Sequence, residues 1–222
     1  MNNSVGNTGR VLWAGLRALL VLTVVCGVLY PLAVTGVAQL VFPGKANGSE
    51  VTDASGEVVG SELIGQTYDL PLKDGEETAA PDLKWFQPRP SNGLGTNTVN
   101  GQYTLILSGA TNRSGDNEDL IQWVKDAKAA VIKDNSTAGY AVKPSDVPAD
   151  AVTSSGSGLD PHISPEYAEL QVHRIAEKNE LTVAQVDKLV ADHTDDRVLG
   201  FIGEPRVNVL KLNIALRELT KG

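Results

Sequence analysis

The stretch ALLVLTVVCGVLYPLAVTGVAQLV, residues 18–41, contains no charged residue. A helix of that length extends about 36 Å, which is enough to cross a hydrocarbon core of roughly 30 Å. Lipid offers no hydrogen-bond partners to a backbone, so a single span must be helical. We therefore predict one transmembrane helix over residues 11–41. Pro31 removes one hydrogen bond inside it and can kink it.

The charges on either side of this span predict its orientation. Arg10 and Arg17 precede the apolar run, the first basic residue after it is Lys45, and no acidic residue occurs before Glu50. A basic excess favours the cytoplasmic side of a membrane. We expect residues 1–10 to be cytoplasmic and everything after the span to be extracytoplasmic.

A cleaved signal peptide is the alternative for this segment. Residues 36–38 (GVA) offer a small-x-small cleavage pattern. The apolar run is, however, longer than the roughly 7–15 residues of a signal core, which favours a retained anchor. Thr23 and Gly27 form a small-xxx-small pair that would let a second helix approach closely, although the same positions could equally face lipid.

Composition limits the function of the remaining chain. Removing the two early arginines leaves 17 basic against 27 acidic residues, and no basic stripe is visible, which argues against nucleic-acid binding. The one cysteine, Cys26, lies inside the span, so the part that follows has neither a disulfide nor a thiolate metal site.

Residues 42–50 read as a linker and residues 51–222 as one soluble domain of α+β class, with short strands early and helices in the C-terminal third. The expected strands are residues 57–59, 63–64, 103–107 and 151–153. A helix begins at Asp116 or Asn117, and another begins at Ser164 with Pro165 in its first turn. Residues 182–185 (TVAQ) form a capping box, and a last helix follows residues 203–205.

Catalytic patterns are weak. Asp160 and His162 could combine with Ser155 or Ser157 as a hydrolase, but the strand-to-helix context of a nucleophile elbow is missing. No paired histidine spacing suggests zinc. Residues 60–67 resemble a phosphate-binding loop in which neutral Gln66 replaces the required lysine.

Trp85, Phe86 and Arg89 form an aromatic and basic segment of the kind found in protein interfaces. Core packing of the two aromatic side chains is the competing interpretation.

Several longer motifs resemble the C subunit of the bacterial Kdp potassium-transporting ATPase. They are Tyr30-Pro31, residues 42–43 (FP), 46–49 (ANGS), 60–66 (GSELIGQ), 85–86 (WF), 89–91 (RPS), 155–165 (SGSGLDPHISP) and 200–210 (GFIGEPRVNVL). The resemblance covers nearly the whole chain in order and spacing. Residues 70–83 and 108–115 depart from the family pattern, so contacts made there would differ.

This resemblance implies an accessory, non-catalytic subunit of an ATP-driven, high-affinity potassium uptake complex in the bacterial plasma membrane. The implied partners are a P-type ATPase subunit, a channel-like potassium-binding subunit and a small single-helix subunit. The ATPase subunit uses ATP, the complex carries potassium, and no cofactor is expected on this chain. The family is described as a catalytic chaperone that raises the ATP affinity of the ATPase subunit.

The short cytoplasmic segment leaves no room for an ATP site, so we expect indirect coupling, with the helix beside the channel-like subunit and the domain over its outer mouth. A membrane-anchored extracytoplasmic hydrolase using Asp160 and His162, or a ligand-sensing module, is the alternative. The following residues are the partner-contact candidates: Thr23, Gly27, Tyr30, Pro31, Trp85, Phe86, Arg89, Asp160, His162, Glu204, Arg206 and Asn208.

Overall fold

The computed structural model describes residues 3–73, 75–76, 78–91 and 108–221. The chain forms two compact units, Met1–Glu50 and Val51–Gly222. The predicted strand over residues 103–107 lies outside the described residues. The architecture is mixed α and β, as the sequence predicts, with short strands early and helices later.

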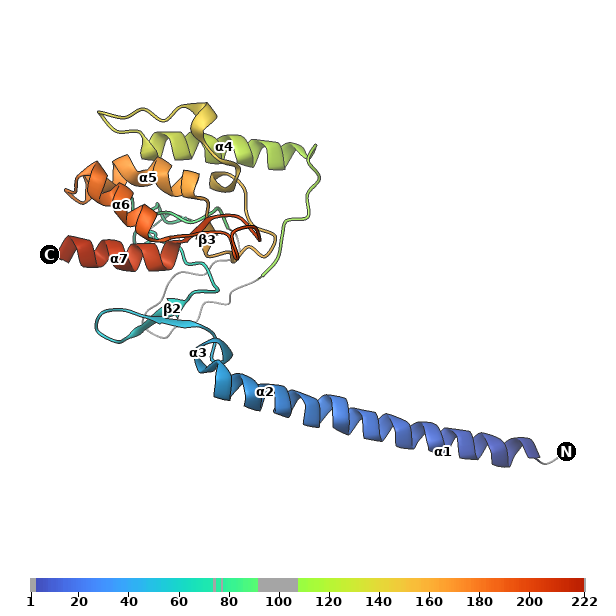
Figure 1. Ribbon diagram of the computed structural model, residues 1–222. Coiled ribbons are helices and arrows are strands. Elements are labelled where there is room, and N and C mark those ends of the chain that lie inside the picture. Colours follow the sequence, from blue (N-terminus) through green and yellow to red (C-terminus); the bar gives the residue numbers. More distant parts are fainter. Residues whose placement is uncertain (1–2, 74, 77, 92–107, 222) are drawn as a thin grey trace. The chain divides into compact units, whose positions relative to one another are not determined.

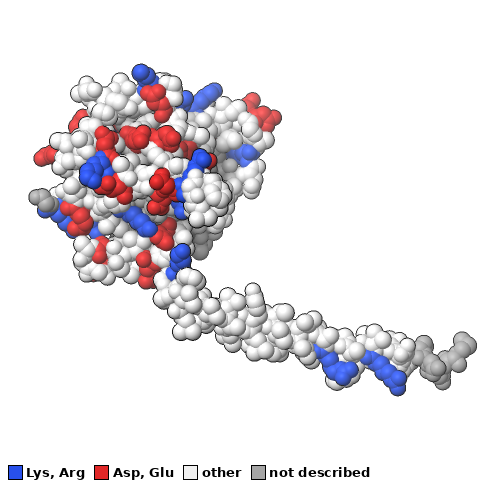
Figure 2. All heavy atoms as spheres, viewed as in Figure 1, with Lys and Arg blue, Asp and Glu red and all other residues white. Residues whose placement is uncertain are grey.

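The first unit is helical. Helix α1 (Asn3–Val24), a π-helical turn η1 (Val25–Leu29) and helix α2 (Tyr30–Val41) follow one another as a continuous rod (Figure 1). Its stretch Gly6–Val41 is long and apolar enough to cross a membrane by length and composition. In Figure 2 the middle of this rod carries no charged atoms. A short helix α3 (Pro43–Ala46) follows, where the sequence reads as a linker.

Pro31 is accommodated by the π-turn that precedes it. Pro31 stands at the start of α2, and the backbone N–H of Tyr30 donates to the carbonyl of Val25, five residues back. A π-turn is the wider form of the helix and is found where the regular bonding pattern is interrupted. The hydrogen-bonding pattern thus changes locally around Pro31, which lacks an N–H, and the helix continues beyond it.

The second unit contains short strands and helices around one core. Its strands are β1 (Glu50–Thr52, beginning at the unit boundary), β2 (Val58–Ser61), β3 (His162–Ile163), β4 (Thr194–Asp195) and β5 (Arg206–Asn208). Its helices are α4 (Glu118–Asn135), α5 (Pro165–Lys178), α6 (Val183–Asp192), α7 (Val209–Lys221) and the 3₁₀ turns η2 (Pro144–Asp146) and η3 (Ala149–Ala151).

The strand β5 organises the centre of this unit. It lies between β3 and β4, antiparallel to both, with His162 opposite Asn208 and Thr194 opposite Val207. Val207 is fully buried. Helices α5 and α7 pack against β5, α6 packs on α5 and α7, and α4 lies on α5 (Figure 1). The core draws most of its side chains from α5 and α7, the two helices with the most buried residues.

The predicted helix starts are confirmed. Asn117 caps α4 by accepting a hydrogen bond from the backbone N–H of Leu120. Ser164 caps α5 in the same way, with Pro165 in the first turn. Thr182 and Gln185 form the capping box of α6. Each start is encoded within four residues, so local sequence is sufficient to specify it.

Two short strand predictions are wrong. Residues 63–64 lie in a turn after β2, and residues 151–153 complete the 3₁₀ turn η3 and a bend. The sequence also gives no sign of β5, which comes between residues 203–205 and α7. A strand of three residues is defined by its distant partners, here β3 and β4, and not by its own periodicity.

Candidate functional site

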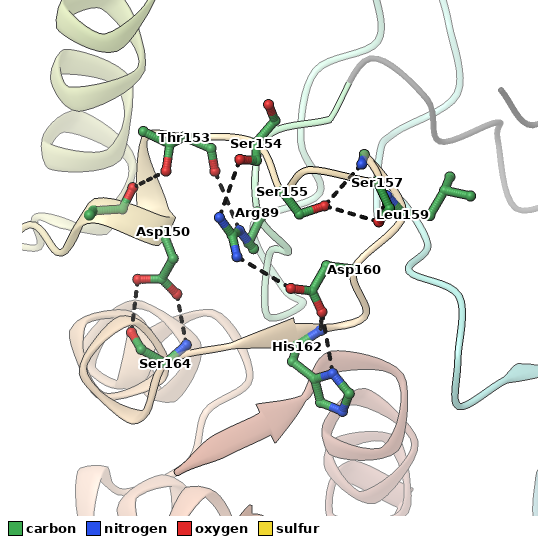
Figure 3. Close-up of polar contacts among 12 residues, drawn as sticks. Arg89, Asp150, Thr153, Ser154, Ser155, Ser157, Leu159, Asp160, His162 and Ser164 are labelled. Atoms are coloured by element: carbon green, nitrogen blue, oxygen red, sulfur yellow. Dashed lines mark hydrogen bonds and ion pairs between the residues drawn. The ribbon is translucent and has the colours of Figure 1, made fainter. Parts of the chain in front are cut away.

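Arg89, Asp160 and His162 form a polar cluster at the start of β3. Nη1 of Arg89 donates to Oδ2 of Asp160 at 3.2 Å, and Nδ1 of His162 lies 3.3 Å from Oδ1 of the same carboxylate (Figure 3). The backbone N–H of His162 also donates to Oδ1 at 3.0 Å. Asp160 and His162 are neighbours in sequence, whereas Arg89 comes from a segment 71 residues earlier.

The electrostatics of the cluster keep Asp160 ionised. The hydrogen bond from the His162 side chain, aided by its backbone N–H and by the charges of His162 and Arg89, lowers the pKa of Asp160 despite partial burial. Both carboxylate oxygens are occupied by donors. Asp160 therefore acts here as an acceptor that holds its neighbours, and its low pKa makes it a poor proton donor near neutral pH.

Arg89 also holds the loop that precedes Asp160. Its guanidinium donates to the carbonyls of Thr153 at 3.4 Å and Ser154 at 3.3 Å (Figure 3). A planar guanidinium suits this arrangement because it presents several donors in fixed directions. One side chain thus ties the 85–91 segment to the loop that leads into β3.

The serines of this loop are engaged in its own turn. The hydroxyl of Ser155 accepts from the backbone N–H of Gly158 at 3.0 Å, and the hydroxyl of Ser157 accepts from that of Leu159 at 3.1 Å. Gly158 has φ +70°, a conformation that glycine adopts without strain. In the described part of the chain no hydrogen bond joins Ser155 or Ser157 to His162. This geometry supplies no nucleophile–base pair.

Five of the predicted contact residues surround one hollow of about 580 Å³. They are Arg89, Asp160, His162, Glu204 and Arg206. Asp150 and Ser164 complete its polar wall, where both oxygens of Asp150 accept from Ser164, at 2.7 Å from the backbone N–H and 2.9 Å from the hydroxyl (Figure 3). Its walls carry both signs of charge. Among the described residues, no group of three His, Cys, Asp or Glu side chains is placed to hold a metal ion.

Trp85, Phe86 and Asn208 lie in packed surroundings. Phe86 is fully buried, and its backbone N–H and C=O pair with the side-chain amide of Asn213 at 2.9 and 3.0 Å. Trp85 packs against the core beside Tyr68, with ring centroids 6.3 Å apart. Asn208 binds the carbonyl of Glu62 and accepts from the backbone N–H of Lys211 near the start of α7. Their partner contacts stay a prediction, and within this chain their role is packing.

The span candidates lie on the surface of the helical unit. Thr23, Tyr30 and Pro31 are exposed, and Tyr30 is 67% exposed. A Cβ atom built on Gly27 would meet only the Thr23 methyl, at 4.0 Å. The surface at Gly27 is therefore open to a close approach by another helix.

Sequence reasoning misses the buried residues that hold the 83–87 segment. Arg174 of α5 is 1% exposed, and its guanidinium donates to the carbonyls of Leu83 and Trp85. Gln171 pairs with both the N–H and the C=O of Gln87, at 2.7 and 3.1 Å. These side chains supply the hydrogen bonds that a neighbouring strand would otherwise give to the backbone of residues 83–87. The partners are more than 80 residues apart, so no spacing in the sequence could reveal them.

The fold and the cluster together define a class: one membrane-spanning candidate helix, followed in the chain by a small α+β domain whose polar cluster is held by hydrogen bonds within the chain. A family model described as KdpC, the c chain of the K⁺-transporting ATPase, matches residues 12–218. The chain therefore belongs to the KdpC family.

Similar proteins named "Potassium-transporting ATPase KdpC subunit" extend over the same length. The protein of Streptomyces avermitilis is 79% identical over 99% of this chain and 98% of its own length. That of Streptomyces coelicolor is 70% identical over 99% and 97%. That of Kineococcus radiotolerans is 44% identical over 98% of each chain.

Proposed function

We propose that this chain is a non-catalytic accessory subunit of an ATP-driven potassium uptake complex in the bacterial plasma membrane. The observation that carries the proposal is the family match over residues 12–218, which includes both the span and the soluble domain. The relatives are named as subunits of a potassium-transporting ATPase, and this chain covers 98% and 97% of the lengths of the two Streptomyces proteins. The partners are a P-type ATPase subunit, a channel-like potassium-binding subunit and a small single-helix subunit.

The N-terminus of the chain is cytoplasmic and residues 51–222 face the outside. Basic residues flank the N-terminal side of the span, while the chain beyond Glu50 is acidic. Residues 1–10, which lie on the cytoplasmic side in this topology, contain no nucleotide-binding motif. An effect on the ATP affinity of the ATPase subunit is therefore indirect, transmitted through helix packing and through the outer domain.

A potassium-limited growth assay tests this function. Deletion of the chain abolishes growth at low external potassium, and the full chain restores it. His162→Ala restores growth to the extent that the complex assembles, because the His162 ring contacts Asp160 of the same chain and, among the described residues, no serine. Normal growth of the deletion strain at low external potassium would contradict the proposal.

The same assay addresses the extracytoplasmic hydrolase. If His162→Ala assembles fully and yet abolishes growth, chemistry at Asp160 and His162 is favoured over an accessory role. Lys188→Ala is the matched control for His162→Ala. It removes an exposed ion pair with Asp192 on α6, and neither residue lines the hollow. We expect it to leave both assembly and growth unchanged.

A further inference from the structure

A short hairpin between β4 and β5 exposes four large apolar side chains within five residues. Residues 197–204 (RVLGFIGE), here called the apolar hairpin, present Leu199 at 79% exposure and Phe201 at 72%. Val198 and Ile202 are 55% and 50% exposed. Single exposed apolar residues are ordinary on a soluble domain, whereas a contiguous group marks a contact surface.

The hairpin backbone is fixed by its own hydrogen bonds. The N–H of Val198 donates to the carbonyl of Ile202 at 2.9 Å, and the reverse bond measures 3.0 Å. A further bond runs from Gly200 N–H to the carbonyl of Arg197 at 3.0 Å. A paired backbone presents the side chains in set directions, which lowers the entropy lost when they bind.

Leu199 occupies a position where leucine is costly. Its φ is +55°, next to Gly200 at +80°. Such positions ordinarily select Gly, Asn or Asp, because a larger side chain is strained in the left-handed region. A leucine here gains no burial within the chain, since most of its surface faces solvent. Local folding therefore does not explain the leucine, whereas an external contact does.

Four of the five charges at the base of the hairpin form ion pairs within the chain. Arg197 binds Glu204, and Nε of Arg206 lies 4.0 Å from Oδ2 of Asp195. The tip between them is uncharged. Such a surface can enter an apolar crevice without bringing an unpaired charge into it.

The charges near the hairpin also indicate whether its partner is a protein or lipid. The base carries three acids, Asp195, Asp196 and Glu204, against the two arginines, and the chain after the span has an acidic excess. Segments that insert into the membrane interface are typically rich in Lys and Arg. The charge pattern therefore favours a protein surface.

We propose that residues 198–202 dock in an apolar crevice on the extracytoplasmic face of a membrane-embedded subunit of the complex. This inference rests on the proposed accessory function and deepens it by naming the docking element. Leu199 and Phe201 are the side chains that enter the crevice.

Photo-crosslinking in the assembled complex tests the docking. p-Benzoylphenylalanine replaces Leu199 in one full-length variant and Leu63, 59% exposed in the same domain, in the control. We expect ultraviolet light to join position 199 to a multi-span subunit that co-purifies with the wild-type chain, and position 63 to give little of that product. Adducts with lipid alone, with a second copy of the chain, or with nothing while the subunits co-purify, overturn the docking proposal only. Absence of the subunits from the wild-type preparation overturns the accessory function, and the docking with it.

A double variant supplies an independent measurement. Leu199→Ser with Phe201→Ser should raise release of the chain from the detergent-solubilised complex roughly tenfold or more. Leu63→Ser with Leu72→Ser, which removes two similarly exposed leucines, should leave release unchanged. The thermal unfolding midpoint of the first variant should not fall, because the side chains removed are unburied. Equal release from both variants contradicts the proposal.

Discussion

Asp160 makes the stability of the polar cluster depend on pH, because its pKa is shifted in the folded chain. Its pKa is lowered, so its contribution to folding is complete above the unfolded value of about 3.9 and disappears as the pH falls through the lower folded value. We expect Asp160→Asn to cost about 0.5–1 kcal/mol of unfolding free energy at pH 7, since the carboxylate is partly exposed. The difference from the wild type should shrink on acidification below about pH 4.

Chemical unfolding of the full chain in mild detergent, followed across pH, measures this difference. A gap between the two proteins that stays constant down to strongly acidic pH would show that the ion pair with Arg89 and His162 contributes no stability.

Arg174 is the buried cation that holds the segment before the cluster. Burial lowers its pKa to about 10, so it remains protonated at neutral pH. Arg174→Met would leave the carbonyls of Leu83 and Trp85 and the side chain of Asn135 without their donor. We expect a loss of about 3–5 kcal/mol in unfolding free energy.

Lys178→Met provides the matched control for Arg174, because Lys178 is exposed on the same helix. Its effect should be within about 0.5 kcal/mol. Similar losses for the two variants in denaturant titrations would argue that the Arg174 network is not what holds residues 83–87.

At the scale of elements, Pro31 and the π-turn η1 that precedes it together set the direction in which α2 presents its side chains. In Pro31→Ala the backbone regains an N–H, and the turn over Val25–Leu29 can close as ordinary α-helix. Converting this π-turn into α-helix, with the number of residues unchanged, rotates the following helix by about 100° relative to α1. We expect a photo-crosslinker at Val34, which is exposed, to lose most of its product with partner subunits.

Leu32→Ala keeps the proline and serves as the control for this rotation. It should retain the crosslink at Val34. An unchanged crosslink in Pro31→Ala would mean that the π-turn does not set the face that α2 presents.

Elements whose signals are local could be predicted, and those made by distant pairing could not. The span and the starts of α4, α5 and α6 follow from apolar runs and capping residues that lie within a few positions of each other. The strand β5 exists because Val207 pairs on both sides, with Ile163 and Thr194. Likewise Asp160 and His162 are visible as neighbours, but only the fold brings Arg89 to them.

At the scale of the whole molecule, orientation is the first prediction. Cys26 is the only cysteine, so a Cys26→Ser chain can carry single reporters. We expect Ser145→Cys, on the exposed surface of the domain, to react with a membrane-impermeant maleimide in intact spheroplasts. Asn7→Cys should react only after permeabilisation, because basic residues hold that end in the cytoplasm. The reverse pattern would invert the proposed topology.

Co-purification from membranes distinguishes a subunit of a potassium-transporting complex from a protein that acts alone. The full chain, tagged at its C-terminus and expressed at its normal level under potassium limitation, is isolated from membranes in mild detergent, and the bound proteins are identified by mass spectrometry. We expect a P-type ATPase and a channel-like potassium-binding protein to be recovered in amounts comparable with the chain itself. Recovery of the chain alone, from membranes that contain both of those proteins, would contradict this expectation.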